Sequence, residues 1–137
     1  MLKIKNLTKS NFRKYGIIIE PKDKNKIFDV LCREDEAVGW RIGYLIFKPE
    51  PIKTLEAHPG SMETFEPVKG ISIIVLAENK RPEKMEAFLL EKPVCLKKGI
   101  WHAILAISKS IEIKITENSK VESIYYKLKK TLNLEIL

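Results

Sequence analysis

The residues of this chain best suited to chemistry are its two histidines, His58 and His102. His58 lies between Glu56 and Glu63, with a Pro-Gly turn after the histidine, and His102 follows a glycine turn and a tryptophan. In an extended segment, Glu56 and His58 project from the same face because side chains alternate along a strand. Imidazole nitrogens and carboxylate oxygens bind Zn, Ni, Mn, Fe or Co, and this mixture of ligands does not choose among those metals.

Each of these residues also has a purely structural interpretation. A buried histidine can be satisfied by a backbone carbonyl, and a glutamate near a turn is often a solvated charge. The position of both histidines beside carboxylates or turns favours metal ligation or acid–base work. Glu63 is then a ligand or a general base, whereas Glu56 stays open between a ligand and an exposed charge at the rim of the site.

Short apolar segments between frequent Pro and Gly residues predict the strands that must position the histidines. Trp40 to Phe47 alternates, Ile71 to Ala77 is a continuous apolar run typical of a strand buried on both faces, and Ile111 to Ile115 alternates again. Many short strands with closely spaced turns indicate a sandwich or barrel. Further strands are expected at 17–19, 85–90 and 102–107, with a short one at 27–31 inside a long loop over 21–38.

Two helices are expected at the ends of the chain. Ser10 is placed to cap a single turn, 11–15, which Gly16 would end. Ser119 and Glu122 have the spacing of a capping box, and apolar residues follow at helical intervals, which predicts a C-terminal helix lying on the barrel or on a second subunit. Residues 1–137 are thus interpreted as one all-β domain with an N-terminal helical turn and a C-terminal helix.

Composition excludes several classes of protein. The chain is 45% hydrophobic and 31% charged, and no apolar run approaches the ~20 residues of a membrane helix. The first residues lack the apolar core of a signal peptide, so a cytoplasmic location and no membrane partner are expected. Cys32 and Cys95 form no Cys-x-x-Cys pair and are interpreted as reduced thiols. The net charge is +7, but acids are interspersed with the lysines, which argues against a nucleic-acid partner.

The spacing of the candidate ligands resembles the two metal motifs of the cupin superfamily. His58-x4-Glu63 has a further possible ligand two positions before the histidine, and Gly99-x-x-His102 follows about 40 residues later. A larger part of the chain, from about 7 to 107, is similar to the ureidoglycolate lyase family. This similarity rests on five segments: Leu7-Thr8-x-x-x-Phe12-x-x-Tyr15-Gly16-x-x-Ile19-Glu20, His58-Pro59-x-x-x-Glu63-x-Phe65-x-Pro67, the hydrophobic run Ile73 to Leu76, Glu86-Ala87-Phe88 and Gly99-Ile100-Trp101-His102.

The resemblance implies a cupin-type double-stranded β-helix, a jelly-roll barrel that is usually dimeric. It also implies a lyase that cleaves the C–N bond of ureidoglycolate, giving glyoxylate and urea in purine (allantoin) breakdown. A divalent metal (Ni, Zn, Mn or Fe) would be held by His58, Glu63 and His102. Glu56 would take the substrate hydroxyl proton, and Lys98 would protonate the departing nitrogen.

Three further residues are candidates for binding a small-molecule carboxylate substrate. Lys97 and Arg41 carry the positive charge that a carboxylate requires, although Arg41 also fits an outward-facing position on its strand. Trp101 is assigned to the substrate-binding set and, in the competing interpretation, packs the turn before His102.

The sequence also departs from the family pattern. Glu56 and Glu63 stand where the patterns usually have His and Gln, and Ala103 and Ile104 replace a His-Pro pair after the Trp-His pair. The segment after residue 108 has no match. Two other functions therefore stay open: a non-catalytic cupin that binds a small carboxylate, and a cupin isomerase or oxygenase with another substrate.

Overall fold

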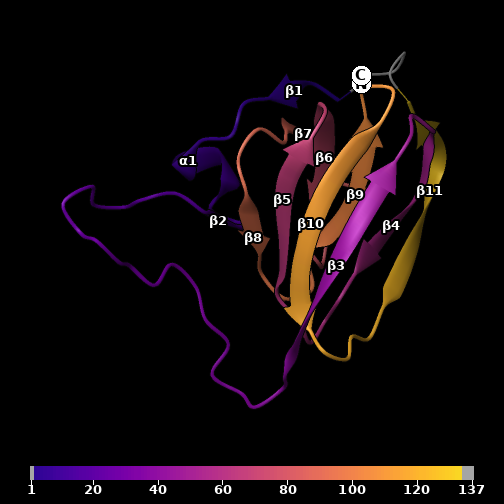
Figure 1. Cartoon of the computed structure of the whole chain (residues 1–137). Helices are drawn as coiled ribbons and strands as arrows, with labels where there is room; N and C mark the ends of the chain where they lie inside the picture. Colours follow the sequence, from indigo (N-terminus) through magenta and orange to yellow (C-terminus); the bar gives the residue numbers. More distant parts are fainter. Residues whose placement is uncertain (1, 134–137) are drawn as a thin grey trace.

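The computed structural model describes residues 2–133, which form two β-sheets that face each other (Figure 1). The six-stranded sheet has the order β1 (Ile4–Lys5), β7 (Glu86–Leu89), β6 (Ser72–Ala77), β9 (Trp101–Ala106), β4 (Ile52–Ala57) and β11 (Ile124–Leu132). The five-stranded sheet has the order β2 (Gly16–Ile18), β8 (Val94–Leu96), β5 (Glu63–Lys69), β10 (Ile111–Asn118) and β3 (Trp40–Phe47). This is the jelly-roll arrangement expected from the resemblance.

Two apolar clusters hold the sheets in place. The first lies between the sheets and joins residues of both, among them Phe65 on β5 and Phe88 on β7. The second contains only residues from the six-stranded sheet and lies on its other face. β6 serves both clusters, because Ile74 faces the first and Ile73 the second. Burial on both faces explains why this strand is a continuous apolar run and does not alternate.

The N-terminal helical turn is present, but its boundaries differ from the prediction. α1 spans Lys9–Phe12, and its cap is Thr8, whose hydroxyl accepts a hydrogen bond from the Asn11 backbone N–H at 3.2 Å. Gly16 does not end the helix. It begins β2, where a Cβ atom would lie 2.0 Å from the carbonyl oxygen of Cys95. The glycine is required by the close approach of β2 to β8.

The predicted C-terminal helix is wrong, because residues 124–132 form the edge strand β11. This strand pairs antiparallel with β4, and Tyr125 lies opposite Glu56. Tyr126 and Leu128 face the second apolar cluster, so a period of two also accounts for their burial. Pairing with the free edge of β4 supplies backbone hydrogen bonds and apolar contacts that outweigh the weak helical spacing.

The strand predicted at 27–31 is also wrong. Residues 19–39 contain no helix or strand, and Figure 1 shows this segment extending away from both sheets. Ile27 and Phe28 are exposed, so these apolar residues do not mark a buried strand. None of the described helical residues forms a segment with the length and hydropathy of a membrane span.

Candidate functional site

The two histidines meet at one end of the barrel. In the antiparallel pairing of β4 with β9, Glu56 lies opposite His102, and His58 follows directly after the end of β4. The centroids of the two imidazole rings are 5.4 Å apart, and the exposed fractions are 6% for His58 and 7% for His102. The fold therefore brings together two buried rings that are far apart in the sequence.

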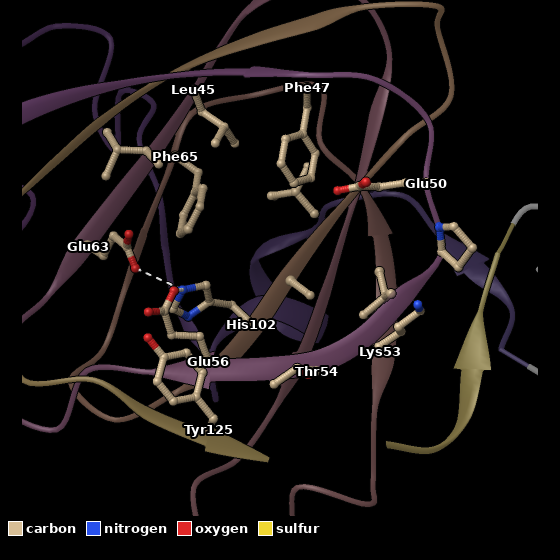
Figure 2. A pocket seen from close by; sticks show the side chains of 15 residues that line it. Leu45, Phe47, Glu50, Lys53, Thr54, Glu56, Glu63, Phe65, His102 and Tyr125 are labelled. Atoms are coloured by element: carbon tan, nitrogen blue, oxygen red, sulfur yellow. Dashed lines mark ion pairs between the residues drawn. The ribbon is translucent and has the colours of Figure 1, made fainter. Parts of the chain in front are cut away.

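Glu63 approaches both rings from the opposite sheet. It is the first residue of β5, and its Oε1 atom lies 3.1 Å from His102 Nε2 (Figure 2). The same atom lies 3.4 Å from His58 Nε2. The residue is only 6% exposed. Glu56 lies at the edge of this group, with its Oε1 atom 3.9 Å from His102 Nε2 and a side chain that is 37% exposed.

Glu117, on β10, is a further member of the site that the sequence analysis missed. It lies opposite Glu63 in the ladder, and its Oε1 atom is 3.7 Å from His58 Nε2. Arg41 donates two hydrogen bonds to Glu117 Oε2, at 2.9 and 2.7 Å from its Nε and Nη2 atoms. The signal was present in the sequence, because the alternation that begins at Ile111 continues to position 117 on the same inward face.

Backbone carbonyls fix the orientation of both imidazole rings. His102 Nδ1 lies 3.1 Å from the carbonyl oxygen of Ile100, and His58 Nδ1 lies 3.1 Å from that of Glu122. A carbonyl oxygen only accepts, so Nδ1 is the donor in each ring and Nε2 of the neutral ring keeps its lone pair. Both Nε2 atoms face Glu63, which is the arrangement that carbonyl-oriented histidines present to a metal ion.

The protonation of the site follows from its burial. Burial, together with the negative charge of Glu117, raises the pKa of Glu63 to about 9. Burial lowers the pKa of His102 to about 4. Near neutral pH the metal-free site therefore contains a neutral His102 and a protonated Glu63. A bound cation would favour loss of the proton from Glu63.

The donor set fits a divalent metal ion. The Oε1 atoms of Glu63 and Glu117 are buried without a hydrogen-bond partner, which is unusual for carboxylate oxygens. Two overlapping groups have one ligand atom from each residue within 4.8 Å of the others: Glu56, His58 and His102, and His58, Glu63 and Glu117. Imidazole nitrogens with carboxylate oxygens suit Zn, Ni, Mn or Fe.

A cavity of about 510 Å³ opens from this cluster (Figure 2). Glu56, Glu63 and His102 lie at one end of it, and Tyr125 extends from β11 with its hydroxyl toward Glu56. Sequence analysis missed Tyr125 as a site residue because it placed this residue on a helix. The remaining lining residues come from β3, β4, β5, β9, β10 and the β3–β4 turn: Leu45, Phe47, Glu50, Pro51, Ile52, Lys53, Thr54, Phe65, Ala103, Ile104 and Ile115.

The structure does not place the other predicted site residues in this cavity. Lys98 forms an ion pair with Glu34 at 2.7 Å. Lys97 lines a hollow beside α1 and also borders a small second hollow that is lined by His58, Glu63 and His102. Trp101 belongs to the second apolar cluster, and its indole N–H donates to the carbonyl of Asn79 at 2.9 Å. Alternation along β9 explains this placement, since the residue before inward-facing His102 must face outward.

The fold is shared with three solved structures of low sequence identity. Tomato (Solanum lycopersicum) vicilin is 18% identical, and the match covers 66% of this chain and 26% of that chain, with a TM-score of 0.52. Brassica napus procruciferin, an 11S globulin, is 6% identical, with 61% of this chain and 22% of that chain covered and a TM-score of 0.51. The S161A mutant of Bacillus subtilis oxalate decarboxylase is 11% identical, with 66% of this chain and 24% of that chain covered and a TM-score of 0.50. The chain thus spans about a quarter of the length of these structures, and the likeness concerns the fold alone.

The sequence itself matches one family. No curated protein matches the chain. A family model described as ureidoglycolate lyase matches residues 46–127, which is more than half of the chain and includes both histidines, Glu63, Glu117 and Tyr125. The predicted resemblance and the predicted fold are both confirmed: this chain belongs to the ureidoglycolate lyase family and has the cupin jelly-roll fold.

Proposed function

We propose that this protein is a metal-dependent lyase that cleaves the C–N bond of ureidoglycolate, or of a closely related small α-hydroxy acid, to give glyoxylate. One observation carries the proposal. Two oriented imidazole Nε2 atoms and the buried carboxylate of Glu63, whose Oε1 has no hydrogen-bond partner, converge at the end of a cavity of about 510 Å³. The family match then supports the choice of reaction.

His58, Glu63 and His102 would hold the metal, with Glu117 as a further carboxylate beside them. Ni, Zn, Mn and Fe all suit these ligands, and the related oxalate decarboxylase structures include one with Mn(II) centres. When bound, a divalent ion would polarise the substrate oxygens and lower the pKa of its hydroxyl group. The carbonyl-bound Nδ1 atoms keep both rings in the required tautomer.

The proton transfers are assigned to residues that line the cavity. Glu56 is the base that takes the hydroxyl proton, since it lies at the partly exposed edge of the cluster. As the C=O bond of glyoxylate forms, the C–N bond breaks and its electron pair goes to nitrogen. The nitrogen must be protonated because an amide anion is a poor leaving group.

Tyr125 replaces Lys98 in our assignment of the acid. Its hydroxyl lies beside Glu56 in the cavity (Figure 2). Lys98, in contrast, is paired with Glu34 and does not line the cavity. After product release, the proton on Glu56 returns to the Tyr125 oxygen, which balances the cycle. Phe65 and Ile104 contribute apolar surface to the lining of the cavity that holds these groups.

The test is glyoxylate release from racemic ureidoglycolate by protein loaded with Ni, Zn, Mn or Fe. We expect release above the uncatalysed rate, and a loss of about 10²–10⁴-fold in kcat for Tyr125→Phe. Tyr44→Phe is the matched control, because Tyr44 lies on β3, outside the cavity lining, and its hydroxyl bonds Glu112 at 2.8 Å. Glyoxylate release no faster than background with every metal would reject the proposal.

A second candidate is a non-catalytic protein that binds a small carboxylate. This candidate is favoured by Ala103 and Ile104, which line the cavity and replace the His-Pro pair of the family pattern. Thermal stabilisation by carboxylates without product formation would identify this case. A ligand at 100 times its dissociation constant stabilises the folded state by roughly 2.7 kcal/mol.

The predicted homodimer remains a proposal, and the outer face of β3 supports it. Trp40 is 71% exposed on this edge strand, and Ile42, Tyr44 and Ile46 are exposed beside it. An exposed apolar row on an edge strand is typical of an interface. Light scattering of the purified protein should give the mass of a dimer, and Ile42→Lys should give a monomer. A monomeric wild-type protein would contradict the proposal.

A further inference from the structure

The cavity is larger than ureidoglycolate requires. Its volume of about 510 Å³ lies within the ~300–1,000 Å³ of pockets that bind drug-sized ligands. Ureidoglycolate is a compact molecule in which every carbon carries oxygen or nitrogen, so it offers no apolar surface. A ligand of that size would occupy only the end of the cavity near His102 and leave the rest to solvent.

One wall of the cavity is apolar along its whole length. Figure 2 shows Phe65, Leu45 and Phe47 along this wall, with Phe65 near Glu63 and Phe47 farther away. Ile115 lies on the same sheet as these residues, and Ile104 lines the cavity from β9 of the facing sheet. Leu45, Phe47 and Ile115 are only partly buried, so an apolar ligand group would remove their remaining surface from water.

The charged groups of the cavity are confined to its two ends. Glu56, Glu63 and His102 lie at one end, and Glu50 and Lys53 lie at the other (Figure 2). Between the two ends, Thr54 on the facing side carries the hydroxyl group of this stretch. The apolar side formed by Phe65, Leu45 and Phe47 offers no side-chain hydrogen-bond partner to a urea group. A polar ligand group placed there would lose its water contacts without replacement, which is unfavourable.

We infer that the cavity binds N-acylated α-hydroxyglycines whose acyl group is apolar, with the hydroxy acid at the His/Glu end and the acyl chain along the wall of Phe65, Leu45 and Phe47. The inference rests on the proposed function for the position of the hydroxy acid. These compounds differ from ureidoglycolate only in carrying an alkyl or aryl group in place of the terminal amino group of the urea.

The same bond is broken in this larger substrate. The hydroxyl proton is removed, the C–N bond breaks as the C=O of glyoxylate forms, and the departing nitrogen takes up one proton. The products are glyoxylate and a primary carboxamide, and no oxidant or reductant is consumed. The apolar chain contributes binding at a distance from the reacting atoms.

N-acylglycines, which lack the hydroxyl group and cannot be cleaved, test the inference by calorimetry on the Mn²⁺-loaded protein. Burying one methylene is worth ~0.8 kcal/mol, so Kd should fall about fourfold for each methylene added from N-acetylglycine to N-hexanoylglycine. N-carbamoylglycine, the analogue of ureidoglycolate, should bind more weakly than the hexanoyl compound. A Kd that does not change with chain length would overturn the inference.

Matched variants on β3 test where the acyl chain of the ligand lies. Leu45→Asn should abolish the dependence on chain length, whereas Ile46→Asn on the outer face of the same strand should preserve it. Leu45→Trp, which fills the cavity and keeps the apolar contacts of the core, should weaken only the longer compounds. If Leu45→Asn and Ile46→Asn changed the dependence of Kd on chain length equally, the placement of the acyl chain beside Leu45 would be contradicted.

Cleavage assays separate this inference from the proposed function. Glyoxylate release should be more efficient from N-hexanoyl-α-hydroxyglycine than from ureidoglycolate, as judged by kcat/KM. Release from neither compound, with the binding series intact, would reject the lyase function and leave the apolar ligand supported. Release from ureidoglycolate with no effect of chain length on binding would support the lyase function and reject the apolar ligand.

Discussion

Replacing Glu63 with glutamine is expected to stabilise the metal-free protein. The pKa of Glu63 is raised from an ordinary value of 4.5 to about 9, first by burial and then by Glu117. At pH 7 the unfolded chain carries an ionised Glu63, so folding must take up a proton. A group with a raised folded pKa contributes stability below its unfolded pKa and loses it as the pH rises toward the folded pKa.

The size of the effect follows from this shift. Between pH 4.5 and pH 7 the free energy of unfolding falls by ~1.36 kcal/mol per pH unit, which amounts to about 3 kcal/mol. Glutamine is neutral at every pH and avoids this loss. Glu63→Gln should therefore raise the stability at pH 7 by up to about 3 kcal/mol and remove the decline between pH 5 and pH 8.

The same substitution should weaken metal binding. A neutral amide oxygen attracts a divalent cation less than a carboxylate does, so the stabilisation by added Zn²⁺ or Mn²⁺ should shrink. The variant is thus expected to be more stable than wild type in a chelator and to gain less from metal. A higher stability in chelator combined with a smaller stabilisation by metal distinguishes this effect from ordinary repacking, which would not change the response to metal.

Urea denaturation in a chelator at pH 5 to 8, repeated with metal, measures both effects. Glu66→Gln is the control, because Glu66 lies on the same strand, carries an ion pair to Lys114 at 3.4 Å and does not line the cavity. Its effect should stay within about 0.5 kcal/mol. A metal-free Glu63→Gln variant that is less stable than wild type at pH 7 would refute the reasoning, since Glu63 would then be ionised and paired with an imidazolium.

Other substitutions test the frame around the site. Burial raises the pKa of Glu86, but hydrogen bonds from two lysines and a tyrosine hold it at about 2, so its stabilisation is lost as the pH falls from 4.5 toward 2. Glu86→Gln should flatten that acid limb of a urea stability profile, by up to about 3 kcal/mol. Gly16→Ala should lower Tm strongly in calorimetry, because its Cβ would lie 2.0 Å from the Cys95 carbonyl oxygen. Arg41→Ala removes two hydrogen bonds to Glu117 and should lower the free energy of unfolding by about 1–2 kcal/mol, and an unchanged value would show that Glu117 does not need them.

The strands were predictable wherever burial alone determined the pattern. β6 is buried on both faces and β10 on one, and both gave clear sequence signals. β11 did not, because Ile124, Tyr125, Leu128 and Leu132 satisfy a helical spacing as well as the contacts of a strand. Only the free edge of β4, a feature of the folded chain, decides between the two.

The site was predictable in its histidines and less so in its partners. His58 and His102 lie in recognisable turn and strand contexts, which the structure brings to within 5.4 Å between ring centroids. Lys98 was assigned as an acid because it lies close to His102 in the sequence. Its ion pair with Glu34 could not be predicted, since Glu34 belongs to a segment without regular structure whose position no local pattern indicates. Glu117 joins the site through a strand register that is set by long-range pairing.

The mouth of the cavity lies between two strands that end their sheets. β3 is the last strand of one sheet and β11 of the other, and no ladder joins them within residues 2–133. Leu45 and Phe47 on β3 and Tyr125 on β11 line opposite sides of the cavity (Figure 2). Because no ladder crosses between β3 and β11 in the described residues, widening the cavity at this place would disturb side-chain packing and would break no ladder hydrogen bond.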